Sequence, residues 1–337
     1  MPRFSISIPT YNRTSHLRKT LESIKVAGAC VSDPPFIRIF DNSDSRVADK
    51  NRELVEEFSR AYPNVLYTSN DKNLGIDGNI RRCIEDSESQ FVWLCGDDDL
   101  FVPNAFVKMG ESLEGFSGGL LFANYVYIDN AYTKVLAEPV VSEKLRDVEM
   151  SGPEFLASHL WKIGFIGSCV IDRLAWQKAE ACEHMLGTYF YHIAKILRIV
   201  EKSYVKICPS VLVLNRSENA RSSTWGKEAL HVYFGFERVL AELPNSYPLI
   251  SEIRENAGIL FRPRSLIWVM SKKADGILRS EQINRYYSNE DSLRRLLLRA
   301  IIILPAWPFA IIKYFLKTLP TTLRAKDIPS EWLRRAP

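Results

Sequence analysis

The sequence predicts an α/β protein with a mostly parallel sheet flanked by helices, followed by a helical C-terminal region. Over the first 130 residues, β-prone segments alternate with segments that repeat apolar residues at helical spacing. A connection through a helix returns the chain to the same edge of a sheet, so this alternation predicts parallel strands with helices on both faces. Beyond residue 225 the alternation stops, which predicts two parts, residues 1–225 and residues 226–337.

The expected strands are short and mostly apolar, and each has a definite end. The first alternates apolar residues with serine from Phe4 to Ile8 and stops at Pro9, which has no N–H for a sheet hydrogen bond. The fourth reads Phe-Val-Trp-Leu-Cys and stops at Gly96, as a buried central strand does. The predicted strands are residues 4–8, 36–40, 65–68, 91–95 and 119–128. The helices between them carry inward apolar residues three or four apart: Leu17, Leu21 and Ile24, then Leu54, Val55 and Phe58, then Ile80, Cys83 and Ile84.

Each of the first four strands runs into a polar loop, and parallel strands deliver such loops to one edge of the sheet. The loop after the fourth strand holds three consecutive aspartates, Asp97 to Asp99. Carboxylates at the end of a buried strand repel one another, so they are costly unless a cation or a donor-rich ligand lies among them. A solvated acidic turn is the alternative. The four loops are residues 10–13, 41–44, 70–75 and 96–99.

Several classes of protein are disfavoured. The first crossover has neither GxGxxG nor GxxxxGK[ST], which argues against a dinucleotide-binding fold or a P-loop enzyme. The net charge of +4 is too mild to indicate a nucleic-acid partner. Six cysteines without CxxC spacing indicate reduced core residues in a cytosolic protein, and Cys182, His184 and His192 lack a fourth ligand for a metal site. The N-terminus runs straight into a strand, so no secretion signal is expected.

The motifs, in their order and spacing, resemble the family 2 nucleotide-sugar glycosyltransferases, which have the Rossmann-like GT-A fold. Among them the chain looks most like the bacterial O-antigen and polysaccharide transferases, including the abequosyltransferase-like group. The resemblance implies transfer of a sugar from a nucleoside-diphosphate donor to a saccharide acceptor. It covers roughly the first 130 residues and rests on Ile8–Arg13, Asp41–Asn42, Asn73–Gly75 and Gly96–Asp99.

The resemblance also implies roles for residues of the four loops. Asp97 and Asp99 match the paired aspartates that hold Mg²⁺ or Mn²⁺ on the donor diphosphate, with Asp99 as the direct ligand. Asp98 would face the ribose or sugar, or else solvent. Asp41 would accept a hydrogen bond from the base or ribose, with Thr10, Tyr11 and Arg13 lining the same pocket. Donor contacts from Asn73 or Arg81 are a further hypothesis, with simple loop closure preferred.

Inverting transfer also needs a base to take the proton of the acceptor hydroxyl. In the family this is usually an aspartate at the start of a helix well past the metal motif. The matching region here is Gly187 to His192, where His192 stands in place of an aspartate. Histidine titrates near neutral pH and can serve as a base, although a lone histidine is more often a buried structural residue. Asp172, after a strand-like run, is the alternative carboxylate.

The run from Asn215 to Trp225 reads as a loop with two arginines, Arg216 and Arg221. Arginine matches phosphate oxygens in a bidentate manner, and family members close a mobile loop over the diphosphate here. Either arginine is a candidate for that contact. An ordinary solvated loop is the alternative.

The C-terminal region contains an apolar segment with basic flanks, about residues 293–324. Its most apolar part, residues 300–316, is too short for a bilayer span and is interrupted by Pro305 and Pro308. Such a segment is typical of a helix lying on an anionic membrane, although a core helix or a dimer contact is the alternative. The expected protein is therefore peripheral at the cytoplasmic face of a bacterial membrane, with a polyprenyl-diphosphate-linked glycan as a hypothetical acceptor.

Two other functions stay open. An inactive nucleotide-sugar-binding or scaffold protein would have the same fold, and the missing acidic base leaves it as an alternative. A nucleotidyltransferase also joins sugar phosphates and nucleotides on an α/β sheet. It normally has a glycine-rich loop after its first strand, which this sequence lacks.

Overall fold

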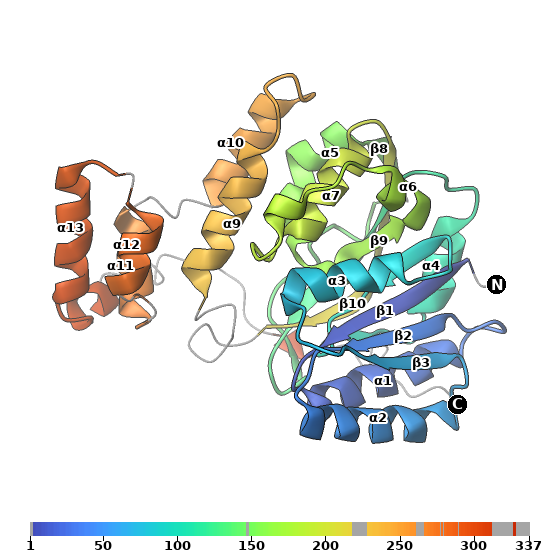
Figure 1. Cartoon of the computed structure of the whole chain (residues 1–337). Coiled ribbons are helices and arrows are strands. Elements are labelled where there is room, and N and C mark those ends of the chain that lie inside the picture. The colour runs from blue at the N-terminus through green and yellow to red at the C-terminus, as the bar shows by residue number, and fades with distance from the viewer. Residues whose placement is uncertain are drawn as a thin grey trace.

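A computed structural model confirms the α/β fold class, with a central sheet flanked by helices (Figure 1). Figure 1 shows α1 and α2 on one face of the N-terminal strands and α3 on the other. The structure describes residues 3–145, 148–217, 228–260, 266–276, 278, 280–288, 290–311 and 326–327.

The N-terminal half of the sheet is parallel, as the alternation predicts. Its strands lie in the order β3, β2, β1, β4, and the register pairs Thr10 with Asp41 and Asp41 with Ser69 at their carboxyl ends. Those ends therefore form one edge of the sheet. The strands are β1 (Phe4–Thr10), β2 (Phe36–Asp41), β3 (Val65–Ser69) and β4 (Phe91–Leu94), connected by α1 (Thr14–Gly28), α2 (Ser45–Ser59) and α3 (Gly75–Glu85).

The other half of the sheet is mixed. β9 lies between β4 and β6 and runs antiparallel to both, while the long β10 runs parallel to β6. Strand direction depends on tertiary pairing, which the apolar pattern of a short strand does not encode. The strands are β5 (Leu100–Phe101), β6 (Leu120–Ile128), β7 (Lys134–Val135), β8 (Val148–Ser151), β9 (Cys169–Asp172), β10 (Tyr204–Arg216) and β11 (Lys326–Asp327). The helices are α4 (Ala105–Leu113), α5 (Gly152–His159), α6 (Arg173–Lys178) and α7 (Tyr191–Val200).

Aromatic packing fixes the strand that leads to the aspartates. Trp93 of β4 is fully buried and meets the ring of Phe101 edge-on, with 4.8 Å between centroids. Its Nε1 donates a hydrogen bond to the carbonyl oxygen of Gly167 at 2.9 Å, so burial leaves no polar atom of the indole unsatisfied. Because β4 is anchored in this way, the loop that follows it leaves the core at a fixed place.

The C-terminal helices divide between two apolar cores. Phe236 and Val239 of α9 and Ile253 of α10 belong to the main core, whereas Leu230 of α9 packs with Leu298 of α13 in a second, smaller cluster. Helix α9 therefore contributes to both cores. Figure 1 shows α11, α12 and α13 grouped away from the sheet. These helices are α9 (Ala229–Ala241), α10 (Ile250–Leu260), α11 (Leu266–Ala274), α12 (Ser280–Tyr286) and α13 (Ser292–Ile303).

No helix in the described part of the chain is long and apolar enough to cross a membrane.

Candidate functional site

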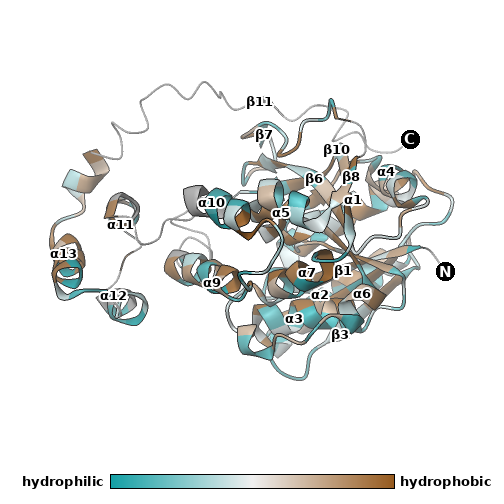
Figure 2. Ribbon diagram, turned by 90° about the horizontal axis from the view of Figure 1, so that it is seen from above, coloured by the Kyte–Doolittle hydropathy of each residue, from teal (hydrophilic) through white to brown (hydrophobic). Residues whose placement is uncertain are grey.

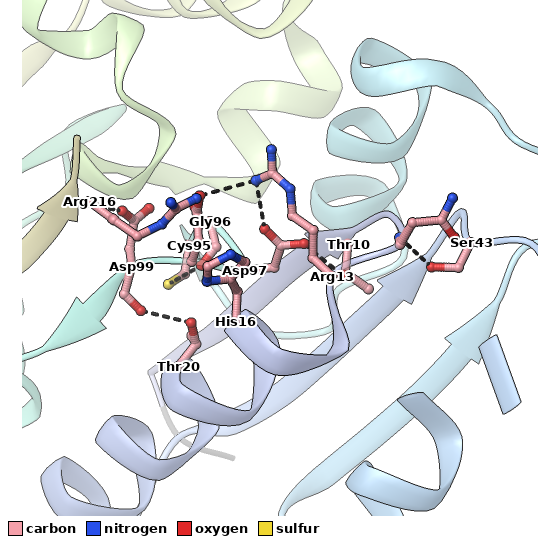
Figure 3. A network of polar contacts seen from close by, with 12 residues as sticks. Thr10, Arg13, His16, Thr20, Ser43, Cys95, Gly96, Asp97, Asp99 and Arg216 are labelled. Atoms are coloured by element: carbon pink, nitrogen blue, oxygen red, sulfur yellow. Dashed lines mark hydrogen bonds and ion pairs between the residues drawn. The ribbon is translucent and has the colours of Figure 1, made fainter. Parts of the chain in front are cut away.

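Two buried aspartates lie at the carboxyl edge of the parallel strands, directly after β4. Asp97 receives a hydrogen bond from Oγ1 of Thr10, the last residue of β1, with 2.7 Å between Oγ1 and Oδ2. Nη1 of Arg13, from the loop after β1, lies 3.3 Å from the other oxygen of Asp97. The structure therefore brings together the first and fourth loops of the sequence prediction (Figure 3).

Arg216 completes this cluster from the last position of β10. Its backbone N–H donates to Oδ1 of Asp99 at 3.1 Å, and its Nη1 donates to Oδ1 of Asn130 at 3.1 Å. Its Nη2 forms an ion pair with Oδ2 of Asp98, and Nη1 of Arg13 lies 3.1 Å from the same oxygen. Arg216 is thus the end of a strand and not part of the loop that the sequence predicts.

Burial and crowding change the acidity of these carboxyl groups. Burial, together with the neighbouring charge of Asp98, raises the pKa of Asp97 to about 6, although Arg13 and Thr10 act in the opposite direction. Burial and the charge of Asp98 also raise the pKa of Asp99 well above its usual range, against the effect of Arg216. Because burial and the charge of Asp98 disfavour the ionised forms of Asp97 and Asp99, a cation bound beside them would stabilise those forms.

Gly96 makes room for the carboxylate of Asp99. A Cβ at this position would lie 2.4 Å from Oδ2 of Asp99 and 3.2 Å from Oδ1 of Asp98. The absence of a side chain thus lets the acid fold back over the end of β4.

The donor set fits a hard divalent cation. Mg²⁺ and Mn²⁺ prefer carboxylate oxygens, and Mg²⁺ is commonly held by one or two carboxylates together with substrate phosphates. Among the described residues no group of three or more Asp, Glu, His or Cys side chains forms a metal cluster. The carboxylates of Asp97 and Asp99 are thus ligands of the kind that such a cation prefers.

Two residues that sequence reasoning missed hold the aspartate loop in place. Thr20 of α1 donates from Oγ1 to the carbonyl oxygen of Asp99 at 2.8 Å, and the hydroxyl of Tyr132 donates to the carbonyl oxygen of Asp98 at 3.3 Å. Thr20 lies on the inward face of its helix, among apolar residues. A polar residue on such a face could have indicated a buried hydrogen bond. Tyr132 is in the turn after β6, where nothing in the sequence pointed to it.

Asp41 organises the loop after β2 from a fully buried position. One of its oxygens accepts from the N–H of Ser43 at 2.7 Å, and the other accepts from Asn51 at 2.8 Å and from the hydroxyl of Tyr67 at 2.7 Å. Oγ of Ser43 in turn accepts from the backbone N–H of Asn12 at 2.7 Å, which ties the loops after β1 and β2 together (Figure 3). Asp41 therefore lies at the carboxyl edge of the parallel strands, as expected, and its carboxylate accepts hydrogen bonds from protein groups.

Three more predicted donor-site residues have other placements. Tyr11 is about half exposed at the rim of this edge. Asn73 accepts from the N–H of Gly75 at 2.8 Å, so it closes the loop, which is the interpretation that the sequence favoured. Arg81 is engaged by two acids on the surface, Glu85 and Glu183. None of these contacts joins Asn73 or Arg81 to the aspartates.

The register contradicts Asp172 as the catalytic base. Asp172 pairs with Phe91, which begins β4, whereas Asp97 to Asp99 follow the end of that strand. It lies at the opposite edge of the sheet because β9 runs antiparallel to β4. There its carboxylate caps α6 by accepting from the N–H of Ala175 at 2.7 Å. The prediction was wrong because strand direction could not be read from the sequence.

His192 is the second residue of α7 and is almost fully buried. Burial lowers its pKa to about 3, so its ring is neutral at physiological pH. Within the described residues neither ring nitrogen has a hydrogen-bond partner. Its assignment as the base stays a prediction. The second candidate arginine of this region, Arg221, lies outside the described residues.

Asp77 is a buried residue that sequence reasoning missed, and it fixes the segment before His192. Its Oδ2 accepts from the N–H of Gly187 at 2.7 Å and of Tyr189 at 2.9 Å, and its Oδ1 accepts from the N–H of Tyr191 at 3.1 Å. Burial raises its pKa, and these N–H groups lower it in part. An acidic residue in the first turn of a helix is usually explained by the helix dipole, so no feature of the sequence distinguished Asp77.

The raised pKa of Asp97 predicts a pH dependence of stability for the metal-free protein. A carboxyl group whose pKa is raised by folding contributes stability below its unfolded pKa of about 4, and that contribution is lost as the pH rises through about 6. Melting in EDTA should therefore show a fall in Tm as the pH rises from about 4 to about 6. Asp97→Asn should flatten this slope; an unchanged slope would contradict the raised pKa.

Comparison with known proteins finds a family match within the N-terminal half of the chain. Residues 5–169 match the model of the family described as Glycosyl transferase family 2. An uncharacterized glycosyltransferase of Mycoplasma pneumoniae is 26% identical over 107 residues, which is 32% of this chain and 34% of that protein. A second, from Mycoplasma genitalium, is 25% identical over 138 residues, 40% of this chain and 43% of that protein. The match thus spans less than half the length of these curated relatives.

Solved structures extend the likeness to most of the chain. S. aureus TarS has a TM-score of 0.58 at 14% identity, covering 93% of this chain and 54% of that one. Residues 1–349 of TarS in complex with UDP-GlcNAc have a TM-score of 0.56 at 13% identity, covering 93% and 92%. The mannosyltransferase PcManGT from Pyrobaculum calidifontis, in complex with GDP-Man and Mn²⁺, has a TM-score of 0.51 at 12% identity, covering 94% and 88%. At these identities the likeness establishes the GT-A fold alone.

Proposed function

We propose that this chain, which carries a Glycosyl transferase family 2 domain, transfers a sugar from a nucleoside-diphosphate donor to a saccharide acceptor. The observation that carries the proposal is the cluster of Asp97, Asp99, Arg13 and Arg216 at the carboxyl edge of the parallel strands. The solved neighbours bound to UDP-GlcNAc and to GDP-Man support a nucleotide-sugar donor. Synthesis of a bacterial surface polysaccharide such as O-antigen is our proposal for its role.

The charges of the site suit departure of a nucleoside diphosphate. When the sugar leaves, negative charge grows on the diphosphate, so the site must supply positive charge there. The guanidinium groups of Arg13 and Arg216 point into the acid cluster and can take phosphate oxygens in a bidentate manner (Figure 3). Asp97 and Asp99 would hold Mg²⁺ or Mn²⁺, which when bound neutralises part of the diphosphate charge. Thr10, Tyr11 and Asp41 would border the nucleoside.

For transfer with inversion, His192 is the remaining candidate for the base. A neutral imidazole can accept the proton of the acceptor hydroxyl, although burial makes this ring a weak base. Asp77 would then act as a positioning residue, because it anchors the segment from Gly187 to Tyr191.

A donor screen tests the proposed function. The purified protein is incubated with UDP-, GDP-, CDP- and dTDP-sugars in Mn²⁺ or Mg²⁺, and release of the nucleoside diphosphate is measured. We expect slow hydrolysis of one donor class, abolished by EDTA. Binding of a donor without turnover, with or without saccharide acceptors, would favour the inactive binding protein. Formation of a nucleotide sugar from a sugar phosphate and a nucleoside triphosphate would favour the nucleotidyltransferase.

We also propose that α13 attaches the protein to an anionic membrane surface, which suits a polyprenyl-diphosphate-linked acceptor. Leu298 and Ile301 of this helix face the second core, while its other side exposes large apolar residues. Arg294, Arg295 and Arg299 lie on the same helix and suit anionic headgroups. Figure 2 shows both apolar and polar colours on α13, away from the sheet. The exposed apolar residues are Leu293, Leu296, Leu297 and Ile303, followed by Leu304 and Trp307.

Replacing Leu296, Ile303 and Trp307 together by serine should weaken binding to phosphatidylglycerol vesicles at least about tenfold, since each loses apolar area from the membrane contact. Co-sedimentation with vesicles measures this. The matched control replaces Leu66 and Leu174, exposed leucines outside the C-terminal helices, and should leave binding unchanged. Unfolding of the triple variant would instead assign these residues to a core, and equal binding would exclude α13 as the anchor.

A further inference from the structure

We propose that the side chain of Asp98 is an internal occupant of the diphosphate site, which holds Arg13 and Arg216 in place until the donor's diphosphate displaces it. The inference rests on the proposed function, because it assigns the two arginines to the donor diphosphate. It adds a role for the middle aspartate that differs from those of its two neighbours.

The three aspartates differ in their partners. Asp97 accepts from the hydroxyl of Thr10 as well as from Arg13, and Asp99 accepts from the backbone N–H of Arg216, so each has a neutral donor that fixes it. Within the described residues, the side chain of Asp98 contacts only the guanidinium groups of Arg13 and Arg216. A single oxygen, Oδ2, takes both contacts. Asp98 is therefore the aspartate that pairs with both guanidinium groups, while Asp97 pairs with Arg13 alone.

The geometry allows the carboxylate of Asp98 to leave while the rest of the site stays. Its side chain is 18% exposed, compared with 3% for the side chain of Arg216. Arg216 is also held by its N–H on Asp99 and by Nη1 on Asn130. The backbone of Asp98 is held at its carbonyl oxygen by the hydroxyl of Tyr132. A rotation of the Asp98 side chain toward solvent would thus release one contact of each guanidinium group, while Arg13 keeps its contact with Asp97 and Arg216 keeps its contact with Asn130.

A diphosphate is the anion that suits the exposed pair. It carries more negative charge than one carboxylate and presents several oxygens, so it can engage both guanidinium groups at once. While the site has no diphosphate, the carboxylate of Asp98 compensates part of the charge of the buried Arg216 and of the partly exposed Arg13. The exchange therefore keeps the arginines paired with an anion whether or not a diphosphate is bound. Because the diphosphate must displace Asp98, its apparent affinity is lower than it would be without the Asp98 carboxylate.

Calorimetric titration of inorganic pyrophosphate into the full-length protein in EDTA tests the exchange. Asp98→Asn removes the competing charge but keeps the shape, so it should bind pyrophosphate about tenfold more tightly than the unaltered protein. Asp49→Asn, at an exposed acid of α2 that pairs with Arg52, should leave the affinity unchanged. Equal or weaker binding by Asp98→Asn would overturn the proposal.

A second pair of variants shows whether the gain acts through the arginine. Arg216→Gln alone should weaken pyrophosphate binding, and the gain from Asp98→Asn should be smaller when Arg216→Gln is already present, because only Arg13 is then released. A gain of the same size in the double variant would mean that Asp98 does not act through Arg216 and would overturn the proposal. Should Asp98→Asn fail to fold, Asp98→Ser provides the same comparison.

Titrating UDP, GDP and inorganic phosphate alongside pyrophosphate separates the sources of the anion. The gain should be seen for diphosphates and be smaller for phosphate; a gain for phosphate alone would overturn the assignment to a diphosphate. Failure of this inference is distinguishable from failure of the proposed function. Tighter pyrophosphate binding without turnover of any donor would retain the exchange and reject the transferase. Donor turnover by the unaltered protein, without tighter pyrophosphate binding by Asp98→Asn, would retain the transferase and reject the exchange.

Discussion

Replacing Asp99 with alanine is expected to lower the turnover of the nucleotide-sugar donor at least about a thousandfold. Asp99 is one of two buried carboxylates that would hold the cation, and its pKa is raised by burial and by the charge of Asp98. Alanine removes the cation ligand and also the acceptor of the Arg216 N–H. Both losses weaken stabilisation of the departing diphosphate. Release of nucleoside diphosphate in Mn²⁺ measures the effect.

The matched control is Asp49→Ala, which removes an exposed acid of α2 and should leave turnover within about twofold of the unaltered protein. The Tm of Asp99→Ala should be close to that of the parent or above it, because a buried acid with a raised pKa is costly to ionise at neutral pH. A folded Asp99→Ala protein with normal turnover would show that the chemistry lies elsewhere.

Replacing Asp77 with alanine should cost about 3 kcal/mol of unfolding free energy and also reduce turnover. Three backbone N–H groups, from Gly187, Tyr189 and Tyr191, donate to this buried carboxylate, and alanine leaves them without that acceptor. Since the same segment leads into His192, loss of the anchor should lower kcat more than it raises KM. Urea unfolding and steady-state kinetics measure the two effects.

Asp86→Ala is the control for this prediction. Asp86 follows the same helix, α3, and pairs on the surface with Arg82, so its loss should cost less than about 1 kcal/mol. Asp77→Asn should be intermediate, because an amide oxygen can accept but carries no charge. If Asp77→Ala unfolds at the same urea concentration as the parent, the segment from Gly187 to Tyr191 is fixed by other contacts.

The parallel strands and the edge that carries the aspartates could be predicted because their signals are local. The alternation of strand and helix implies parallel strands, and parallel strands share their carboxyl edge. This is sufficient to bring Thr10 and Arg13 to Asp97, as the structure shows. Glycine after the apolar strand marked where the acidic loop begins, and Gly96 does provide the space into which Asp99 folds.

The remaining parts of the site depend on pairings between distant segments. The place of Asp172 at the opposite edge could not be predicted, because the direction of β9 is set by its neighbours β4 and β6. Arg216 was expected in a loop, but it is held as the end of β10 by pairing with Ile128 of β6. Asp77 accepts hydrogen bonds from backbone groups more than a hundred residues away, and backbone donors leave no mark on the sequence.

A crystal structure of the protein with Mn²⁺ and the nucleoside diphosphate chosen by the donor screen tests the central claim most directly. We expect an anomalous scattering peak for Mn²⁺ beside the carboxylate of Asp99, with the diphosphate between that ion and the guanidinium groups of Arg13 and Arg216. Mn²⁺ and diphosphate bound together at another place, with Asp97 and Asp99 still in their present contacts, would contradict it.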